Sequence, residues 1–178
     1  MIRAALLLSL LTLAGCTSFA HPLLGESGEA FDQRLVGHWV VEVEEDETLD
    51  LAIQPDGQAQ ISSSEDDGRV EKETFRVRTA RLGEFDIANA MMNADGETFW
   101  HLLRYELVGA GEELHVFICD GGTWYDAVHS RKLSGRADRG QHGPSTFVTA
   151  STQKLRAFLR SHHDSAFVAE PLVLRKTP

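Results

Sequence analysis

The chain has 178 residues, of which 42% are hydrophobic and 25% charged, and its formal net charge at pH 7 is −10. This length suggests one domain, and the hydrophobic content suits an ordinary globular core rather than a chain that is membrane-like throughout. The acidic balance argues against nucleic acid as a partner, because phosphates require a basic surface. It also disfavours a protein that lies flat on anionic lipid.

Residues 1–15 have the parts of a secretory signal peptide: Arg3, an apolar run from Ala4 to Leu13, and small residues before a cleavage site. The run is too short to span a bilayer, which needs about 20 residues. It ends in Leu13-Ala14-Gly15-Cys16, which resembles the lipobox of bacterial lipoproteins. That resemblance implies cleavage before Cys16 and acylation of this cysteine, an effectively permanent membrane anchor. Thr17, where an Asp would favour the inner membrane, implies the periplasmic face of the outer membrane.

Residues 16–34 show no sustained apolar period of 2 or 3.6, and they contain Pro22 and the run Gly25-Glu26-Ser27-Gly28. We therefore expect an acylated flexible tether over 16–34, able to reach up to about 60 Å when extended. The folded domain is expected over residues 35–178.

From Leu35 to Cys119 the apolar residues mainly alternate with polar ones, which is the pattern of half-buried strands. Turn residues separate the runs, as in Pro55-Asp56-Gly57 and Asn93-Ala94-Asp95-Gly96. No intervening segment is long enough for a crossover helix, so consecutive strands should pair antiparallel. Seven or eight such strands predict an all-β domain with one or two short helices, built as an up-and-down barrel. The apolar rows begin with these residues: Trp39, Leu49, Ala59, Phe75, Phe85, Phe99 and Leu114.

The pattern changes after Cys119. We expect a short helix capped by Thr123, a mobile loop over 134–144, a strand over 146–149, a helix capped by Ser151 and a closing strand over 166–175. If Cys16 carries lipid, Cys119 has no partner in the chain. Its apolar neighbours favour a buried, inert thiol, because free cysteine behaves as a small hydrophobic residue.

Gly37-x-Trp39, at the start of the first strand, resembles the Gly-x-Trp signature of lipocalins. The resemblance implies a barrel in which the tryptophan closes one end and a basic side chain from near the C-terminus packs on it. Arg175 is the candidate partner, because a guanidinium over an indole is a favourable cation–π pair. The chain is similar in general to small lipocalin-like lipoproteins of proteobacteria, a group with no assigned activity.

The sequence contains no recognisable catalytic motif, metal-site spacing or phosphate-binding loop, so we expect no enzyme activity, no metal and no cofactor. His162, His163 and Asp164 are adjacent rather than spaced as His-x₃-His on a helix face. They more simply serve the end of the preceding helix. His101 and His115 lie within strands and could point into the barrel together, although a satisfied core or surface histidine is the commoner case.

Two non-catalytic functions follow. The first is an envelope interaction module that binds a protein or cell-wall partner through loops such as 62–69 and 134–144. The alternative is a carrier of one small apolar ligand, such as a lipid or fatty acyl compound, in the barrel lumen. A lumen with free space would favour the carrier, and a filled lumen with an exposed apolar patch would favour the module. The expected lining residues are Trp39, Phe75, Phe85, His101, Leu103 and Tyr105.

Overall fold

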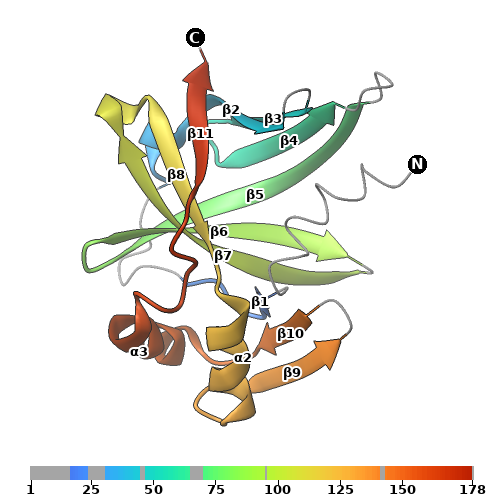
Figure 1. The fold of residues 1–178 in the computed structure, drawn as a ribbon, viewed down its shortest axis with the longest axis vertical. Coiled ribbons are helices and arrows are strands. Elements are labelled where there is room, and N and C mark those ends of the chain that lie inside the picture. Colours follow the sequence, from blue (N-terminus) through green and yellow to red (C-terminus); the bar gives the residue numbers. More distant parts are fainter. Residues whose placement is uncertain are drawn as a thin grey trace.

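The computed structural model describes residues 17–23, 31–44, 47–64, 70–94, 96–140 and 143–177. They form a mostly β protein with two α-helices and two short 3₁₀ helices (Figure 1). The elements are, in chain order, β1 (Thr17–Phe19), η1 (Gln33–Leu35), β2 (Gly37–Glu44), β3 (Glu47–Ile53), β4 (Gln58–Ser64), β5 (Val70–Leu82), β6 (Phe85–Ala94), β7 (Glu97–Val108), η2 (Gly109–Gly111), β8 (Glu113–Ile118), α2 (Gly121–His129), β9 (Gly135–Gly140), β10 (Gly143–Val148), α3 (Thr152–His162) and β11 (Leu172–Thr177).

Eight of the strands, β2 to β8 and β11, form a closed antiparallel barrel. From β2 to β8 each strand pairs with the next along the chain, β11 pairs with both β8 and β2, and the β6–β7 pairing closes the ring. This confirms the expected all-β, lipocalin-like, up-and-down barrel. The result follows from the short connections between β2 and β8, because neighbouring strands joined by tight turns can only run antiparallel.

The last strand closes the ring. β11 pairs antiparallel with β8 on one side and with β2 on the other, where Lys176 lies opposite Trp39 and Arg175 opposite Val40. Leu174 points inward and is 2% exposed. Because side chains alternate along a strand, Lys176 shares the inward face with Leu174 and Arg175 faces outward.

The cation over Trp39 is therefore Lys176, and the expectation that Arg175 would take this place is wrong. The Lys176 ammonium lies 5.1 Å from the centre of the indole, whereas Arg175 lies 3.8 Å from the Glu113 carboxylate. Gly37 has a φ of +141°, and a Cβ atom there would come within 2.8 Å of the Lys176 side chain. The glycine of the Gly-x-Trp pattern thus leaves the space through which the lysine reaches the tryptophan.

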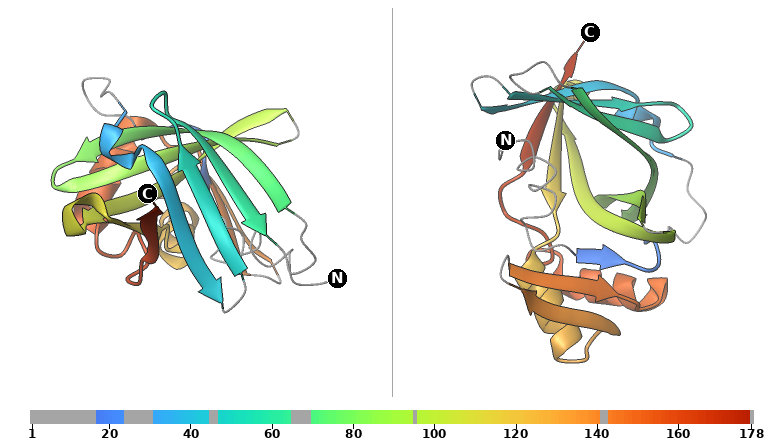
Figure 2. Two further views of the ribbon diagram at one scale, coloured as in Figure 1. Left: turned by 90° about the horizontal axis from the view of Figure 1, so that it is seen from above. Right: turned by 90° about the vertical axis from the view of Figure 1, so that its right-hand side faces the viewer.

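The segment between β8 and β11 forms a second layer against the barrel. Figure 2 (right) shows α2, α3, β9 and β10 gathered below the barrel, with β1 between them and the barrel strands. Residues 134–144, expected as a mobile loop, instead contain β9 and the start of β10, which pair as a hairpin. The cap of α2 is Asp120 rather than Thr123, since the Asp120 carboxylate accepts a 2.7 Å hydrogen bond from the Thr123 amide.

This layer buries the outer face of β6, β7 and β8. A hydrophobic cluster there joins barrel residues such as Trp100 and Leu102 to Trp124 of α2 and Leu155 of α3. A separate cluster fills the barrel interior around Trp39. Because β6 and β7 are apolar on both faces, alternation in their sequences does not reveal which face is the lumen.

The N-terminal part of the expected tether belongs to the folded domain. β1 pairs parallel with β10 and antiparallel with β7, and Phe19 is fully buried against Trp124, with ring centres 4.9 Å apart. Leu23 exchanges two backbone hydrogen bonds with the Asn89 side chain, at 2.6 and 2.9 Å. The tether prediction is thus wrong for residues 17–23 and 31–34, while residues 24–30 lie outside the described residues.

Replacing Trp39 with alanine should lower the free energy of unfolding by about 3–5 kcal/mol. The ring has no exposed surface, and its Nε1 donates a 2.9 Å hydrogen bond to the Leu35 carbonyl. Chemical denaturation followed by circular dichroism measures the change. Val108→Ala is the control, because Val108 is 39% exposed and its loss should cost less than about 0.5 kcal/mol. An unchanged midpoint for Trp39→Ala would show that the ring is not a core element.

Lys176→Met should lower the free energy of unfolding by about 0.5–1 kcal/mol through loss of the cation–π contact. Arg175→Met should have the smaller effect, because the Arg175 side chain is 71% exposed and its ion pair with Glu113 is solvated. The same denaturation measurement compares the two variants. A larger loss in Arg175→Met than in Lys176→Met would contradict the assignment.

Candidate functional site

The barrel interior is the candidate site because its walls are mostly apolar. Its buried members lie on the inward faces of the barrel strands and on η1, with half-buried apolar side chains packed around them. The buried set is Leu35, Trp39, Val41, Ile53, Ala59, Val77, Ala88, Tyr105, Leu114 and Leu174. A barrel of eight strands has an interior that side chains can fill or that can hold one small ligand.

One end of the barrel is closed by the chain itself. Residues 31–35 lie across the end where β2 begins, and Leu35 is 2% exposed. The Gln33 side chain reaches the Pro55 carbonyl at the β3–β4 turn, 3.1 Å away. The Phe31 ring packs on the interior cluster. We call this the closed end. The opposite end, where the β2–β3, β4–β5 and β6–β7 connections lie partly outside the described residues, is called the open end.

A polar cluster beneath the closed end holds residues 31–35 in place. Tyr105 donates a 2.8 Å hydrogen bond from its hydroxyl to the Asp32 carboxylate, and the Asp32 amide donates to Thr79 Oγ1 at 2.8 Å. Arg34 bridges the carboxylates of Asp32 and Asp86, at 2.6 and 3.1 Å. Each carboxylate oxygen therefore lies close to a charged or strong hydrogen-bond donor. These contacts fix the position of residues 31–35 across the end of the barrel.

The pKa values of the cluster follow from these contacts. Burial acts to raise the pKa of Asp32, but hydrogen bonds from Arg34 and Tyr105 outweigh it, so the pKa lies below its usual value. The pKa of Tyr105 is raised, first by burial and then by its bond to Asp32. At neutral pH the pair is consequently a phenol that donates to a carboxylate, which is the favourable charge-assisted arrangement.

Several inward side chains of the interior cluster are only half-buried, in contrast to Trp39 and Ile53, which are 0% and 5% exposed. They are Leu49 and Leu51 of β3, Phe75 of β5, and Leu103 and Leu107 of β7. Inward side chains of a solidly packed barrel would be buried along its whole length. The partial exposure indicates that water reaches part of the interior.

His101 lies on the inward face near the open end, opposite Ala90 of β6. Its Nδ1 is 3.1 Å from the Thr17 carbonyl oxygen, so Nδ1 carries the proton and donates it. Burial lowers the pKa of His101, and the hydrogen bond to Thr17 and the charge of Glu73 offset this only in part. The imidazole is therefore neutral at pH 7, and the inward face carries polar groups here, His101 on β7 and Glu73 on β5.

Five of the six expected lining residues lie on the inward face: Trp39, Phe75, His101, Leu103 and Tyr105. The prediction is wrong for Phe85, which lies on the outer face of β6. There it packs on the outer cluster, 5.0 Å from the ring of His163 and 5.3 Å from the Arg104 guanidinium. The α3 layer buries this face of β6, and that burial explains why an outward residue is a phenylalanine.

The histidines do not meet in the barrel. His115 pairs with outward positions of β7 and β11 and lies 3.3 Å from the Glu113 carboxylate, so its expected inward orientation beside His101 is wrong. His162 stacks on Phe158 with ring centres 4.2 Å apart, while His163 contacts Asp164 at 3.4 Å. Among the described residues, no three histidine, cysteine, aspartate or glutamate side chains converge as metal ligands.

Cys119 is buried and unpaired, as its apolar neighbours predicted. Its Sγ lies 3.3 Å from the Leu102 carbonyl, and burial strongly raises the pKa of the thiol. A thiol held neutral in this way is a poor nucleophile. Separately, no helix in the described ranges is long and apolar enough to cross a bilayer.

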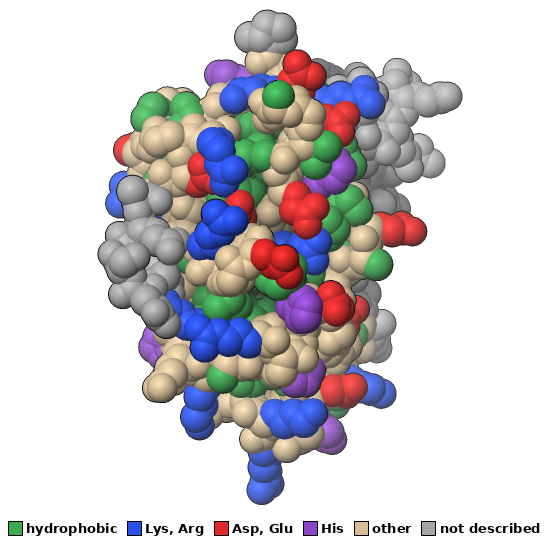
Figure 3. All heavy atoms as spheres, turned by 90° about the vertical axis from the view of Figure 1, so that its left-hand side faces the viewer, with side chains coloured by type: hydrophobic (Ala, Val, Ile, Leu, Met, Phe, Trp, Pro, Cys, Tyr) green, Lys and Arg blue, Asp and Glu red, His purple; other side chains and the backbone are tan. Residues whose placement is uncertain are grey.

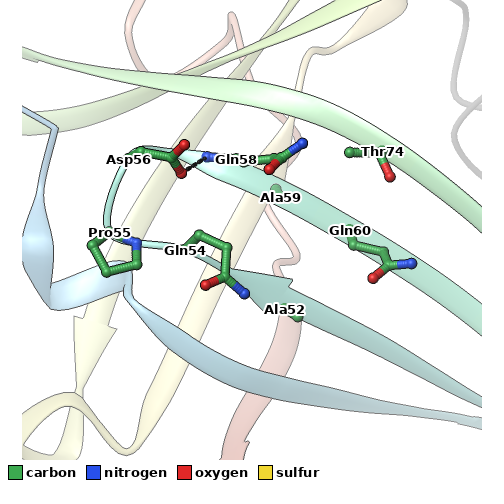
Figure 4. A pocket seen from close by; sticks show the side chains of 8 residues that line it. All are labelled: Ala52, Gln54, Pro55, Asp56, Gln58, Ala59, Gln60 and Thr74. Carbon is green, nitrogen blue, oxygen red and sulfur yellow. Dashed lines mark hydrogen bonds between the residues drawn. The ribbon is translucent and has the colours of Figure 1, made fainter.

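The structure also contains hollows outside the barrel. One of about 500 Å³ lies on β3, β4 and β5 and is lined by polar or small side chains, including Gln54, Gln58 and Gln60 (Figure 4). Asp56 there accepts a 3.0 Å hydrogen bond from the Gln58 amide. A second, of about 380 Å³, lies beside α2 and α3. Both are open to solvent, unlike the apolar sites that usually enclose small ligands.

Sequence reasoning missed the cluster around Asp32. Asp32, Arg34 and Thr79 come from segments that do not meet until the barrel closes, and the tether prediction removed the first two from the domain. The available indication was the tyrosine within an apolar row: a buried Tyr105 needs a hydrogen-bond partner for its hydroxyl. Which residue supplies it is decided only by the fold.

We expect the Asp32 cluster to make stability fall at acidic pH. Because the folded-state pKa of Asp32 lies below the unfolded value of about 3.8, its contribution is complete above that pH and is lost as the pH falls towards the folded-state pKa. Chemical denaturation between pH 6 and about pH 3 should therefore show a smaller acid-induced loss in Asp32→Asn than in the parent chain. Glu84→Gln, an exposed change outside the cluster, is the control. Identical pH profiles for Asp32→Asn and the parent would contradict this account.

Comparison with known proteins gives no family to which the chain can be assigned. No protein-family model, curated protein or solved structure matches it.

Proposed function

We propose that the chain is a membrane-anchored envelope lipoprotein whose barrel binds one small apolar molecule, such as a lipid or fatty acyl compound. The observation that carries this proposal is the half-buried state of apolar side chains that point into the barrel, among them Leu51, Phe75 and Leu103. Removing such surface from water is favourable by about 25 cal/mol per Å², so an apolar guest would be stabilised there.

The closed end supports a single entrance. The Asp32 cluster and the indole of Trp39 cover one end, where Trp39 and Leu35 are 0% and 2% exposed. An apolar chain entering from the open end would meet Leu and Phe walls first and the Trp39 region last. His101 and any polar head of the ligand would then lie on the same side, near the entrance.

The proposed chemistry is binding without catalysis. The one described cysteine is a buried, neutral thiol, and His101 on the inward face is a neutral histidine with a backbone partner. The anchor on Cys16 and the location at the periplasmic face of the outer membrane are proposed from the resemblance of residues 13–16 to a lipobox. Cys16 itself lies outside the described residues.

An envelope interaction module is the second candidate. The observation in its favour is β9, which is mostly exposed and pairs only with β10 among the described strands. Its free edge and the exposed Arg136 and Arg139 offer backbone and charged groups to another chain. Part of the other expected contact region, residues 65–69, lies outside the described residues.

Fluorescence titration with cis-parinaric acid tests the ligand-binding proposal. The soluble mature chain, from Thr17 onward, should bind one equivalent. Leu103→Trp fills the lumen from β7 and should therefore raise the dissociation constant by about tenfold or more. A tenfold rise corresponds to a loss of about 1.4 kcal/mol of binding free energy. Val173→Trp is the matched control, since Val173 lies on the outside of β11 and is 38% exposed.

The result depends on the comparison between these variants, each first checked for cooperative unfolding. Equal binding by Leu103→Trp and the parent chain would place the probe outside the lumen. No saturable binding by the parent chain would reject the carrier function and leave the interaction module as the better candidate.

A further inference from the structure

β9 is the edge strand of the second layer. It ends the sheet order, and among the described strands it pairs only with β10. Figure 1 shows β10 between it and β1, with β9 on the side away from the barrel. An edge strand presents one row of backbone N–H and C=O groups that the sheet itself does not pair, and such a row can pair with the edge of another chain.

The ladder between β9 and β10 fixes which backbone groups of β9 point outward. The Thr149 amide donates a 2.8 Å hydrogen bond to the Ser134 carbonyl, and these two residues continue the register of the hairpin. Hydrogen-bonded pairs alternate along an antiparallel ladder. The even-numbered residues, among them Arg136 and Asp138, therefore direct their backbone groups towards β10.

The odd-numbered residues of β9 direct their backbone groups to the free edge. They are Gly135, Ala137 and Arg139. The position of Pro144 opposite Arg139 agrees with this assignment, because proline has no N–H to donate to β9. The edge thus offers three residues whose N–H and C=O groups can each join a further antiparallel strand.

The side chains of β9 fall into two sets. Ala137 packs on the outer cluster, and the Arg139 guanidinium lies 4.9 Å from the ring centre of Tyr125 of α2, so this set faces the helix. Arg136 and Asp138 project from the opposite face, where their side chains are 80% and 71% exposed and 3.5 Å apart. An ion pair this exposed contributes little within one chain. Both charges are therefore accessible to a neighbouring strand.

The rest of the described surface offers fewer features for docking. Four large hydrophobic side chains are exposed among the described residues: Val70, Val108, Leu172 and Val173. On the face drawn in Figure 3, acidic and basic side chains are interspersed, and hydrophobic side chains show between them as separate areas. Surfaces that dock partners through apolar contact are usually contiguous apolar patches. Backbone pairing at the β9 edge is therefore the stronger feature.

A second copy of β9 fits these groups in one register. With Ala137 opposite Ala137 of the second copy, Arg136 of each chain lies opposite Asp138 of the other. Arg139 then lies opposite Gly135, which leaves room for the arginine side chain. A shift of two residues in either direction places Arg136 opposite Arg136 or Asp138 opposite Asp138, and like charges directly opposite are destabilising. Charge complementarity thus selects a single two-fold arrangement.

We propose that the chain forms a two-fold dimer by antiparallel pairing of β9 with β9 of a second copy, with two Arg136–Asp138 ion pairs fixing the register. This dimer joins the second layers of two molecules into one continuous sheet. It does not depend on a ligand in the barrel, and it specifies a partner for the interaction surface named above. One pair of six-residue strands buries less area than a standard interface, so we expect a weak dimer.

Cysteine cross-linking tests the register. Arg136→Cys and Asp138→Cys are prepared in the chain from Thr17 onward, which contains every described residue and whose own Cys119 is buried. In the proposed pair, residue 136 lies opposite residue 138 of the other copy, with about 4.5 Å between Cα atoms. Two residues of the same number are diagonal neighbours about 7–8 Å apart, beyond the range of about 4.4–6.8 Å that a disulfide allows.

The two cysteine variants are mixed and mildly oxidised, and the products are identified by intact mass. We expect the heterodimer to form several-fold faster than either variant forms a dimer with itself. The pairing of unlike positions distinguishes the proposed register from contact at another surface, which would give a statistical mixture of the three dimers.

Charge exchange at the same two positions tests the ion pairs without cysteine. Asp138→Arg places like charges opposite each other and should raise the dimer dissociation constant by about tenfold or more, measured by sedimentation equilibrium. The double change Arg136→Asp with Asp138→Arg restores opposite charges and should restore the dimer. Glu84→Arg is the control, since it changes the net charge equally at an exposed position outside β9.

Ala137→Pro tests the backbone pairing. Because the Ala137 N–H faces the free edge, proline there should keep the β9–β10 ladder and the unfolding midpoint while abolishing the dimer. Binding of cis-parinaric acid should not change in this variant, so the dimer and the barrel ligand are tested separately.

Three results would overturn the dimer. They are a statistical mixture of disulfide products, a parent chain that stays monomeric at about 1 mM, and a parent dimer that Asp138→Arg leaves unchanged. Restoration of the dimer by the double charge exchange, together with preferred heterodimer cross-linking, would support it even if Ala137→Pro failed to fold.

Discussion

The insertion of β11 between β8 and β2 is the interaction on which the rest of the structure depends. It converts a curved meander with two free edges into a ring, so that inward side chains from all eight strands share one interior. The same pairing places Lys176 opposite Trp39, and the closed end is built around that indole. Because β11 follows a long excursion, closure also requires the second layer to return the chain to the correct gap.

β1 connects the barrel to that second layer. Phe19 packs on Trp124 of α2, and the strand itself is hydrogen-bonded between β7 and β10. The outer face of β6 to β8 is thereby buried, and the protein has two hydrophobic clusters separated by a sheet. The consequence for function is an asymmetric barrel. One end is covered by residues 31–35, and part of the interior has half-buried apolar walls.

The barrel class was predictable because it depends on local features. Alternation, short turns and the lack of a crossover segment between residues 39 and 118 allow few arrangements other than an antiparallel meander. Much of the lumen was predictable for the same reason, since Trp39, Phe75, Leu103 and Tyr105 follow the alternation of their strands. Phe85 and His115 were placed wrongly because strands covered on both sides have apolar residues on both faces, and alternation then has two possible phases.

The sequence by itself determined the strand-and-turn pattern, the all-β class, the buried character of Cys119 and the lipobox-like leader, since each depends on neighbouring residues alone. Only the tertiary structure decided that Lys176 covers Trp39, that Asp32 accepts the hydrogen bond of the Tyr105 hydroxyl and that residues 17–23 form part of the domain. These contacts join segments far apart in the chain. A short segment such as Thr17–Phe19 has no pattern of its own, and it becomes a strand because two strands of the fold offer it unpaired edges.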